Sequence, residues 1–223
     1  MGATLTTRTK SWKPGTRART TVLARLAGEL KRNYRCHTVI LYGSRARGDH
    51  SPASDYDLVG ICQSGPVRHV ARRLGRAYVD AFVYPEGKAK PAELLRIRGG
   101  RVLFQKRRFG ETLLHRIDRL HARGPKALSP DEMTLRRHWA QKMLDRARRA
   151  DAEGHFRRVW LLNALLEDYF ALRGMWYEGP KVSLRWLRDN EPEIAALFAK
   201  GLRPGARLSQ VAKLAVAVTA VAA

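Results

Sequence analysis

The spacing of the apolar residues changes near Gly110, and this change most limits the folds open to the chain. Before Gly110, short segments rich in β-branched and aromatic residues are bounded by Gly, Ser or Pro, as strands are. The predicted strands are 37–42, 55–62, 78–84 and 101–104. After Gly110, apolar residues recur at helical spacing. The sequence therefore predicts an α+β fold with a small mixed sheet followed by an all-α helical bundle.

Helical spacing also sets the expected order of segments. In the first half it predicts helices over 21–33 and 67–74; the helices predicted after Gly110 are 110–124, 129–152, 155–174, 182–188, 192–200 and one from about 208. Ser129, Pro130 and Glu132 form the hydroxyl, proline and glutamate pattern of a helix N-terminus. We expect three parts: a basic arm over 1–20, a sheet domain over 21–110 and a helical domain over 111–223.

The charge of the chain indicates what it can attract. The 223 residues include 43 Lys and Arg against 20 Asp and Glu, a formal net charge of +23. Residues 1–20 carry five basic residues and no acidic one, and residues 1–110 carry 23 basic residues against 7 acidic ones. Such a field attracts polyanions and repels cationic small molecules. A solvated basic surface without a polyanionic partner is the competing interpretation.

The cysteine content and the lengths of the apolar runs indicate the cellular compartment of the protein. Cys36 and Cys62 are the only cysteines, which leaves no disulfide framework and no thiolate zinc site. We interpret both as small buried residues at strand ends, and Trp139, Trp160 and Trp186 as core. No apolar run reaches the roughly 20 residues needed to cross a bilayer. We therefore expect a cytoplasmic protein with no membrane contact and leave its oligomeric state open.

The segment 41–58, LYGSRARGDHSPASDYDL, carries the chemistry. Gly43 and Ser44 follow a predicted strand, where a glycine allows close backbone approach to a phosphate and a serine can bind one. Asp55 and Asp57 begin the next strand, and a spacing of two puts both carboxylates on one face. Either pattern alone is common in structural turns and strands. Together they predict a site for a phosphate and a divalent cation, Mg²⁺ or Mn²⁺.

A third carboxylate, Asp80, lies in the predicted strand 78–84. If this strand neighbours 55–62, Asp80 joins Asp55 and Asp57 and the three can serve a two-metal site. The alternation of the strand also permits Asp80 to face solvent.

These residues resemble the DNA polymerase beta-like nucleotidyltransferase superfamily over roughly residues 21–105. The resemblance makes Gly43 and Ser44 the nucleotide-phosphate loop and Asp55, Asp57 and Asp80 the metal-binding catalytic triad. It also places Ser54 beside the triphosphate. The helical half more loosely resembles the acceptor-binding bundle of the kanamycin and lincosamide nucleotidyltransferases.

The resemblance implies transfer of a nucleotide, with AMP from ATP as the expected case, to an acceptor hydroxyl with release of pyrophosphate. Arg45 and Arg47 follow the phosphate loop, and Arg45 is the candidate to neutralise pyrophosphate. In the helical half, Lys181 resembles the lysine that relatives bring to the triphosphate.

Glu167 and Asp168 lie on the apolar segment 155–174, where a carboxylate is costly unless it is paired or functional. We take Glu167 as the candidate second general base. Pairing of one of the two with Arg173 or another arginine is the competing interpretation.

The sequence does not identify the acceptor of the nucleotide. Positive charge favours RNA, such as a tRNA end, or another polyanion. The alternatives are a small-molecule, antibiotic-type nucleotidyltransferase, a toxin–antitoxin-type enzyme that transfers AMP to a protein, and a non-catalytic nucleic-acid-binding module.

Overall fold

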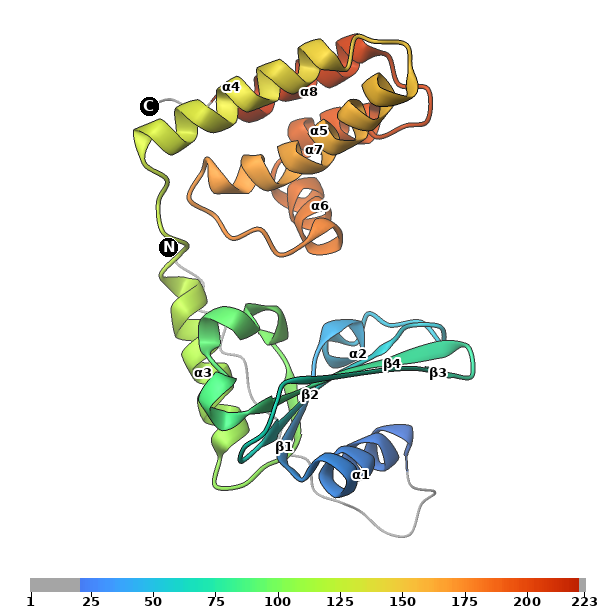
Figure 1. Ribbon diagram of the computed structural model, residues 1–223, viewed down its shortest axis with the longest axis vertical. Helices are drawn as coiled ribbons and strands as arrows, with labels where there is room; N and C mark the ends of the chain where they lie inside the picture. The colour runs from blue at the N-terminus through green and yellow to red at the C-terminus, as the bar shows by residue number, and fades with distance from the viewer. Residues whose placement is uncertain (1–20, 221–223) are drawn as a thin grey trace. The chain divides into compact units, whose positions relative to one another are not determined.

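The computed structural model describes residues 21–220, and the predicted basic arm over 1–20 lies outside them. The described residues form two compact units, which are considered separately (Figure 1). The first unit comprises 21–90 and 99–114, and the second comprises 91–98 and 115–220. A mixed sheet in the first unit and helices in the second confirm the predicted α+β class.

The first unit is built on a five-stranded sheet in the order β3-β4-β2-β1-β5. Its strands are β1 (Cys36–Leu41), β2 (Tyr56–Cys62), β3 (Arg68–Leu74), β4 (Ala77–Pro85) and β5 (Arg101–Phe104). Strands β2 and β4 pair in parallel, and the other three pairings are antiparallel. The four strands predicted from sequence correspond to β1, β2, β4 and β5, which confirms them.

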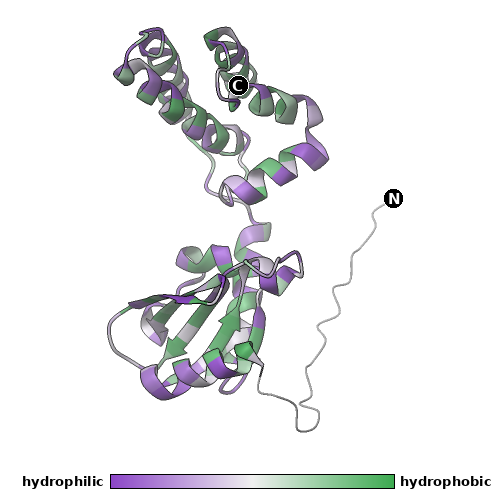
Figure 2. Ribbon diagram, turned by 90° about the vertical axis from the view of Figure 1, so that its right-hand side faces the viewer, coloured by the Kyte–Doolittle hydropathy of each residue, from purple (hydrophilic) through white to green (hydrophobic). Residues whose placement is uncertain are grey.

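Helix α1 (Val22–Tyr34) covers one face of this sheet. The hydroxyl of Thr21 accepts a hydrogen bond from the backbone N–H of Ala24 and caps the helix at its start. Leu26, Ala27 and Leu30 are buried against alternate strand residues such as Leu58 and Ala81. Figure 2 shows the apolar residues of the strands in green. Since α1 fills this face, the intervening residues of β2 and β4, which include Asp57 and Asp80, lie on the opposite one.

The prediction of a helix over 67–74 is wrong, because this segment forms strand β3. Residues Val70, Arg72 and Leu74 alternate with more exposed neighbours, which is the period of a half-buried strand. Gly75, at φ +64°, turns the chain so that β3 returns antiparallel to β4. Pairing with β4 therefore outweighs the weak helical spacing of this segment.

The two cysteines lie opposite each other on β1 and β2, and both are buried free thiols. Burial, together with the neighbouring Cys62, raises the pKa of the Cys36 thiol to about 12. Their predicted role as small buried residues is confirmed.

Short helical segments follow two of the strands. Helix α2 (Gly43–Arg47) comes after β1, on the sheet face opposite α1. The 3₁₀ segments η1 (Glu86–Lys88) and η2 (Pro91–Ile97) come after β4. Helix α3 (Phe109–Ala122) passes from the first unit into the second. None of the segments α2, η1 and η2 was predicted, since each is too short to show helical periodicity.

The second unit is a helical bundle. Its remaining helices are α4 (Pro130–Arg146), α5 (Ala152–Ala171), α6 (Pro180–Asn190), α7 (Pro192–Gly201) and α8 (Leu208–Thr219). Its core contains Leu161, Leu165, Tyr169, Phe198 and Leu214. No helix among residues 21–220 is both long and apolar enough to span a membrane.

The capping pattern predicted at Ser129 is confirmed at the start of α4. The Ser129 hydroxyl accepts from the Glu132 N–H at 3.2 Å, and the Glu132 carboxylate accepts from the Ser129 N–H at 2.7 Å. The end of α4 was predicted near residue 152 but lies at Arg146. The chain turns there because Asp151 caps α5 by accepting a hydrogen bond from the Gly154 N–H.

Candidate active site

The turn after β1 brings backbone against a carboxylate. Gly43 has φ +69°, a conformation that residues with a side chain rarely adopt. A Cβ at Gly43 would lie 2.1 Å from Oδ2 of Asp57. Glycine at position 43 therefore leaves room for the Asp57 carboxylate directly beside the main chain.

Asp57 and Asp80 stand side by side on the sheet. They are register partners in the parallel pair of β2 and β4. Register partners on adjacent strands are about 4.8 Å apart and point to the same face. The Asp80 side chain is 38% exposed. The convergence of these two residues, which the sequence left conditional on strand order, follows from the pairing of β2 with β4.

Asp55 lies just before β2, and its carboxylate binds the main chain of the neighbouring strand. Its Oδ1 accepts a hydrogen bond from the backbone N–H of Tyr78 at 3.2 Å, at the start of β4. Within residues 21–220, no group of three or more His, Cys, Asp or Glu side chains is close enough together to hold a metal ion. The structure thus brings Asp57 and Asp80 together near the start of β2, with Asp55 bonded to the neighbouring main chain.

His69 is a site residue that sequence analysis missed. Its Nε2 lies 2.5 Å from Oδ1 of Asp80, and its ring stacks on Phe82 with centroids 4.2 Å apart. His69 lies on β3, which pairs antiparallel with β4, and its register partner on β4 is Phe82. A strand assignment for 67–74 would have placed His69 on the Asp80 face. The alternation of this segment was therefore the available signal.

Arg45 holds the loop that leads into β2. Its Nε donates to the carbonyl oxygens of Ser54 at 3.0 Å and Asp55 at 3.1 Å, and its Nη2 donates to Ser54 O at 2.6 Å. The guanidinium also lies 3.9 Å from the ring centroid of Tyr56. Arg45, expected at a pyrophosphate, thus positions the loop before Asp55 in this structure.

The two predicted phosphate-side serines have different surroundings. Ser54 closes a turn, in which its hydroxyl accepts from the Ser51 N–H at 2.9 Å. Ser44 is 7% exposed, and its carbonyl accepts from the backbone N–H groups of Gly48 and Asp49. Ser44 is therefore buried next to Gly43, whereas the Ser54 hydroxyl accepts a hydrogen bond within its own loop.

The acidic residues predicted on α5 differ in burial. Asp168 is 4% exposed and forms an ion pair with Nη1 of Arg136 on α4. Burial raises the pKa of Asp168, and the Arg136 guanidinium opposes that rise. Arg173, the suggested partner, instead donates to the carbonyls of Tyr169 and Val218. Glu167 is exposed on the same helix.

Lys181 and the aromatic loop before it also belong to the second unit. Lys181 is exposed in the first turn of α6. Trp176 Nε1 donates to the carbonyl of His121 at 3.0 Å, and the Glu178 carboxylate lies 2.8 Å from His121 Nε2. The loop is thus attached to α3. Of the tryptophans predicted as core, Trp139 and Trp186 pack against the core, whereas Trp160 is 45% exposed and that prediction is wrong.

Comparison with known proteins identifies the class of the first unit. Residues 23–92 match the family model of the nucleotidyltransferase domain. This segment runs from α1 into η2 and contains Gly43, Asp55, Asp57 and Asp80. The chain therefore carries a nucleotidyltransferase domain, and the resemblance to the polymerase beta-like superfamily is confirmed.

More distant comparisons add little. The crystal structure of a nucleotidyltransferase-like protein from Exiguobacterium sibiricum 255-15 is similar with a TM-score of 0.44 and 14% identity, covering 87% of this chain and 72% of that chain. This similarity is too low to carry an argument about function. No curated protein matches the chain.

Proposed function

We propose that the first unit transfers a nucleoside monophosphate from a nucleoside triphosphate to an acceptor hydroxyl, with help from a divalent cation. The observation that carries this proposal is the pairing of Asp57 with Asp80 on parallel strands, beside a glycine turn that fits no side chain. Two adjacent carboxylates repel each other unless a cation or a proton is shared. The nucleotidyltransferase domain match over the same residues supports a cation.

The residues fit a Mg²⁺ or Mn²⁺ ion in their chemistry. Asp57 and Asp80 would hold it, since carboxylate oxygens are the ligands that these hard cations take. Asp55, two residues before Asp57, would join them only after releasing its hydrogen bond to the Tyr78 N–H. The absence of a Cβ at Gly43 leaves the space that the Asp57 carboxylate occupies. When bound, the ion would neutralise phosphate charge and lower the pKa of the attacking hydroxyl.

The other residues of the site bind and orient. In this proposal the main chain at Gly43 and Ser44 lies along the triphosphate, where no side chain blocks its approach. Arg45 and Tyr56 hold the loop of Ser54 and Asp55 so that Asp55 keeps its place before β2. Arg45 therefore acts as a positioning residue. The proposal is confined to the first unit, and Glu167 and Lys181 take no part in it.

The proposed reaction is balanced without a redox partner. The acceptor oxygen forms a bond to the α-phosphorus, and the bond from that phosphorus to the oxygen bridging to the β-phosphorus breaks. Pyrophosphate leaves, and the hydroxyl proton passes to solvent. ATP is the first donor to test, because the superfamily resemblance implies AMP transfer.

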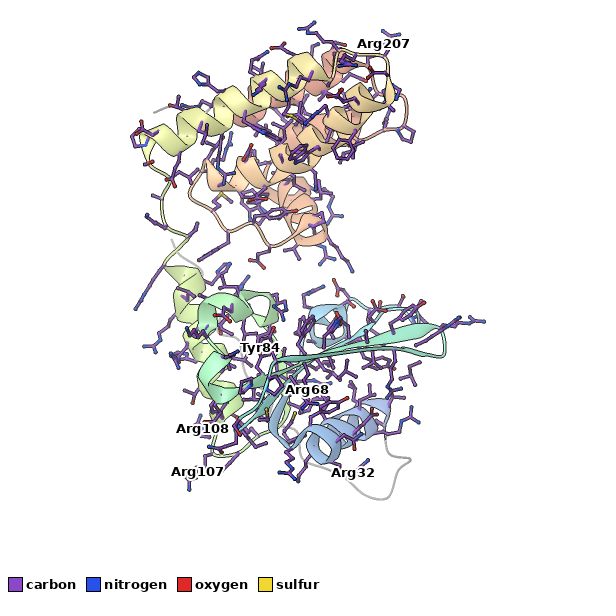
Figure 3. The ribbon with its side chains drawn as sticks, viewed as in Figure 1. Arg32, Arg68, Tyr84, Arg107, Arg108 and Arg207 are labelled. Atoms are coloured by element: carbon purple, nitrogen blue, oxygen red, sulfur yellow. The ribbon has the colours of Figure 1, made fainter. Side chains whose placement is uncertain are left out.

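We propose a polyanion, such as RNA, as the acceptor. The support is charge: residues 1–110 carry 23 basic residues against 7 acidic ones. Arg32, Arg68, Arg107 and Arg108 are all exposed on the first unit (Figure 3). Exposed arginines attract a phosphate backbone by releasing its counterions.

The test is to incubate the protein with each α-labelled nucleoside triphosphate, Mg²⁺ and either total RNA or cell lysate. We expect label in RNA, with ATP as the preferred donor and pyrophosphate as the second product. Label in a small molecule or a protein would overturn the polyanion acceptor but keep the transfer reaction. Absence of label with every donor, both acceptor pools and either metal would overturn the reaction itself.

A further inference from the structure

A cavity lies in the helical unit, between α4 and α5. Its volume is about 460 Å³, within the range of small-molecule sites. Helix α4 contributes Glu132, Leu135, Arg136 and Trp139, at the spacing of one helix face. Helix α5 contributes Trp160, Ala164, Glu167 and Asp168, at the same kind of spacing. The cavity is therefore formed by two packed helix faces.

Large apolar side chains remain uncovered around this cavity. Leu135 is 68% exposed and Trp160 is 45% exposed. The rings of Trp139 and Trp160 meet edge to face with centroids 5.6 Å apart, so they form a fixed aromatic wall. A ligand that covers Leu135 and Trp160 would remove apolar surface from water.

The charge of the lining is opposite to that of the chain. Its ionisable residues are three carboxylates and one guanidinium, and Arg136 is already paired with Asp168. Glu132 is held by Ser129, and Lys126 lies near enough to help lower its pKa. Glu167, by contrast, is exposed at the cavity. In a chain of net charge +23, this is a local site of negative charge.

The ring of Trp160 already makes a cation–π contact. The guanidinium of Arg157 lies 5.7 Å from the ring centroid of Trp160. Tryptophan faces attract cations through the ring quadrupole. An organic cation in the cavity would have tryptophan rings and the Glu167 carboxylate as partners, whereas an organic anion would meet a lining of three carboxylates and one guanidinium, which is already paired.

We propose that this cavity binds a small organic cation with an apolar body, such as a quaternary or alkylated ammonium group. This proposal does not depend on the proposed nucleotide transfer. Its elements are the Trp139 and Trp160 wall, the uncovered Leu135 and the Glu167 carboxylate.

The test compares matched probes on the full chain. Benzyltrimethylammonium measures binding of an aromatic cation, and choline with its neutral isostere 3,3-dimethylbutan-1-ol isolates the effect of charge. Binding is followed by the NMR shifts of the tryptophan indole N–H groups, assigned with Trp139→Phe and Trp160→Phe variants. We expect saturable shifts at Trp139 and Trp160, and choline binding about tenfold tighter than the neutral alcohol.

Variants then locate the site. Glu167→Gln should weaken benzyltrimethylammonium binding about fivefold, since it removes one partly exposed charge. Glu193→Gln, an exposed glutamate on α7 that does not line the cavity, should change nothing. Both positions are exposed, so both variants should fold, which circular dichroism checks. Three outcomes would each overturn the proposal. They are equal binding of choline and the alcohol, shifts confined to other tryptophans, and no saturable binding up to about 50 mM. Only a negligible affinity would escape detection at that concentration.

Discussion

Single residues around Asp57 decide whether its carboxylate can take part in the proposed reaction. It lies beside the main chain of Gly43 and opposite Asp80, so its surroundings come from three separate segments. The contact with the main chain of Gly43 depends on the absence of a side chain at that position. The first two predictions therefore concern Asp57 and Gly43.

Replacing a carboxylate of the pair should remove transfer and leave the fold intact. We expect Asp57→Asn or Asp80→Asn to lower nucleotide transfer at least about a hundredfold, because each removes a proposed metal ligand worth several kcal/mol in the transition state. Stability should be unchanged or slightly higher in Asp57→Asn, since like charges no longer face each other. Asp80→Asn also loses the ion pair with His69, so its stability should not rise. The measurements are labelled-nucleotide transfer and urea unfolding.

The control for this pair is Asp118→Asn, an exposed aspartate on α3. It removes the same charge without touching the pair. Full transfer activity in Asp57→Asn or Asp80→Asn would contradict the proposed role of these carboxylates.

Gly43→Ala should damage both the fold and the site. The new Cβ would meet Asp57 Oδ2 and would force alanine into φ +69°. We expect a loss of about 2 kcal/mol in the free energy of unfolding, together with a loss of transfer. Gly205→Ala is the matched control, since Gly205 has φ +76° with nothing within 4 Å of its Cβ position.

The control should lose about 1 kcal/mol from backbone strain alone and keep its activity. If the two variants lose the same stability and both keep full transfer, the contact between Gly43 and Asp57 is unimportant.

At the scale of elements, helices α4 and α5 are joined by a buried charge pair. Asp168 is 4% exposed and Arg136 is its ion-pair partner. Removing one partner of such a pair leaves a buried charge without compensation. The third prediction follows from this pairing.

Arg136→Met should lower the free energy of unfolding by about 2–3 kcal/mol, below the full cost of breaking a buried pair because the Arg136 side chain is 33% exposed. Without the guanidinium, burial raises the pKa of Asp168 further. A group whose folded-state pKa is raised binds more protons when folded, so the variant should gain stability as the pH falls from 7 toward 5. Urea unfolding at several pH values measures this slope.

The double variant Arg136→Met, Asp168→Asn supplies the control. It should recover part of the stability and lose the added pH dependence. If Arg136→Met shows the same pH profile as the unaltered protein, Asp168 does not carry the buried charge.

At the scale of the whole molecule, net charge is the dominant property. The value of +23 includes five basic residues and no acidic ones within residues 1–20. This segment lacks the proposed metal ligands. Its contribution to acceptor binding can therefore be separated from the chemistry.

Removing residues 1–20 should weaken RNA binding and leave nucleotide binding unchanged. For the full chain, log affinity for RNA should fall with log salt by about 0.7 for each single-strand phosphate neutralised. The truncated chain should show a flatter slope and less transfer to RNA. Filter binding at several salt concentrations and labelled transfer measure both effects.

The reference in this experiment is the affinity for ATP with Mg²⁺, which should be equal in the two chains. An unchanged salt slope and full RNA labelling after truncation would contradict a role of the segment in acceptor binding. Transfer that is flat in salt for both chains would instead favour a small-molecule acceptor.

The sequence by itself determined the class of fold and the place of the nucleotide motif. Strand and helix periods, the Ser129 capping pattern and the Gly43-Ser44 and Asp55-x-Asp57 spacings are local, so neighbouring residues carry the whole signal. The α+β class followed from these patterns, and the Gly43-Ser44 and Asp55-x-Asp57 motifs carried the resemblance to the nucleotidyltransferase superfamily. The short helix α2 and strand β3 escaped this reasoning, because α2 is shorter than two turns and β3 depends on its pairing with β4.

Only the tertiary structure decided which side chains meet. Asp57 lies opposite Asp80 because β2 and β4 pair in parallel at that register, and hydrogen bonds between distant strands leave no mark in local spacing. The same holds for Asp168 with Arg136. The physical reason is that each contact joins residues far apart in the chain, whose meeting is set by the packing of whole elements.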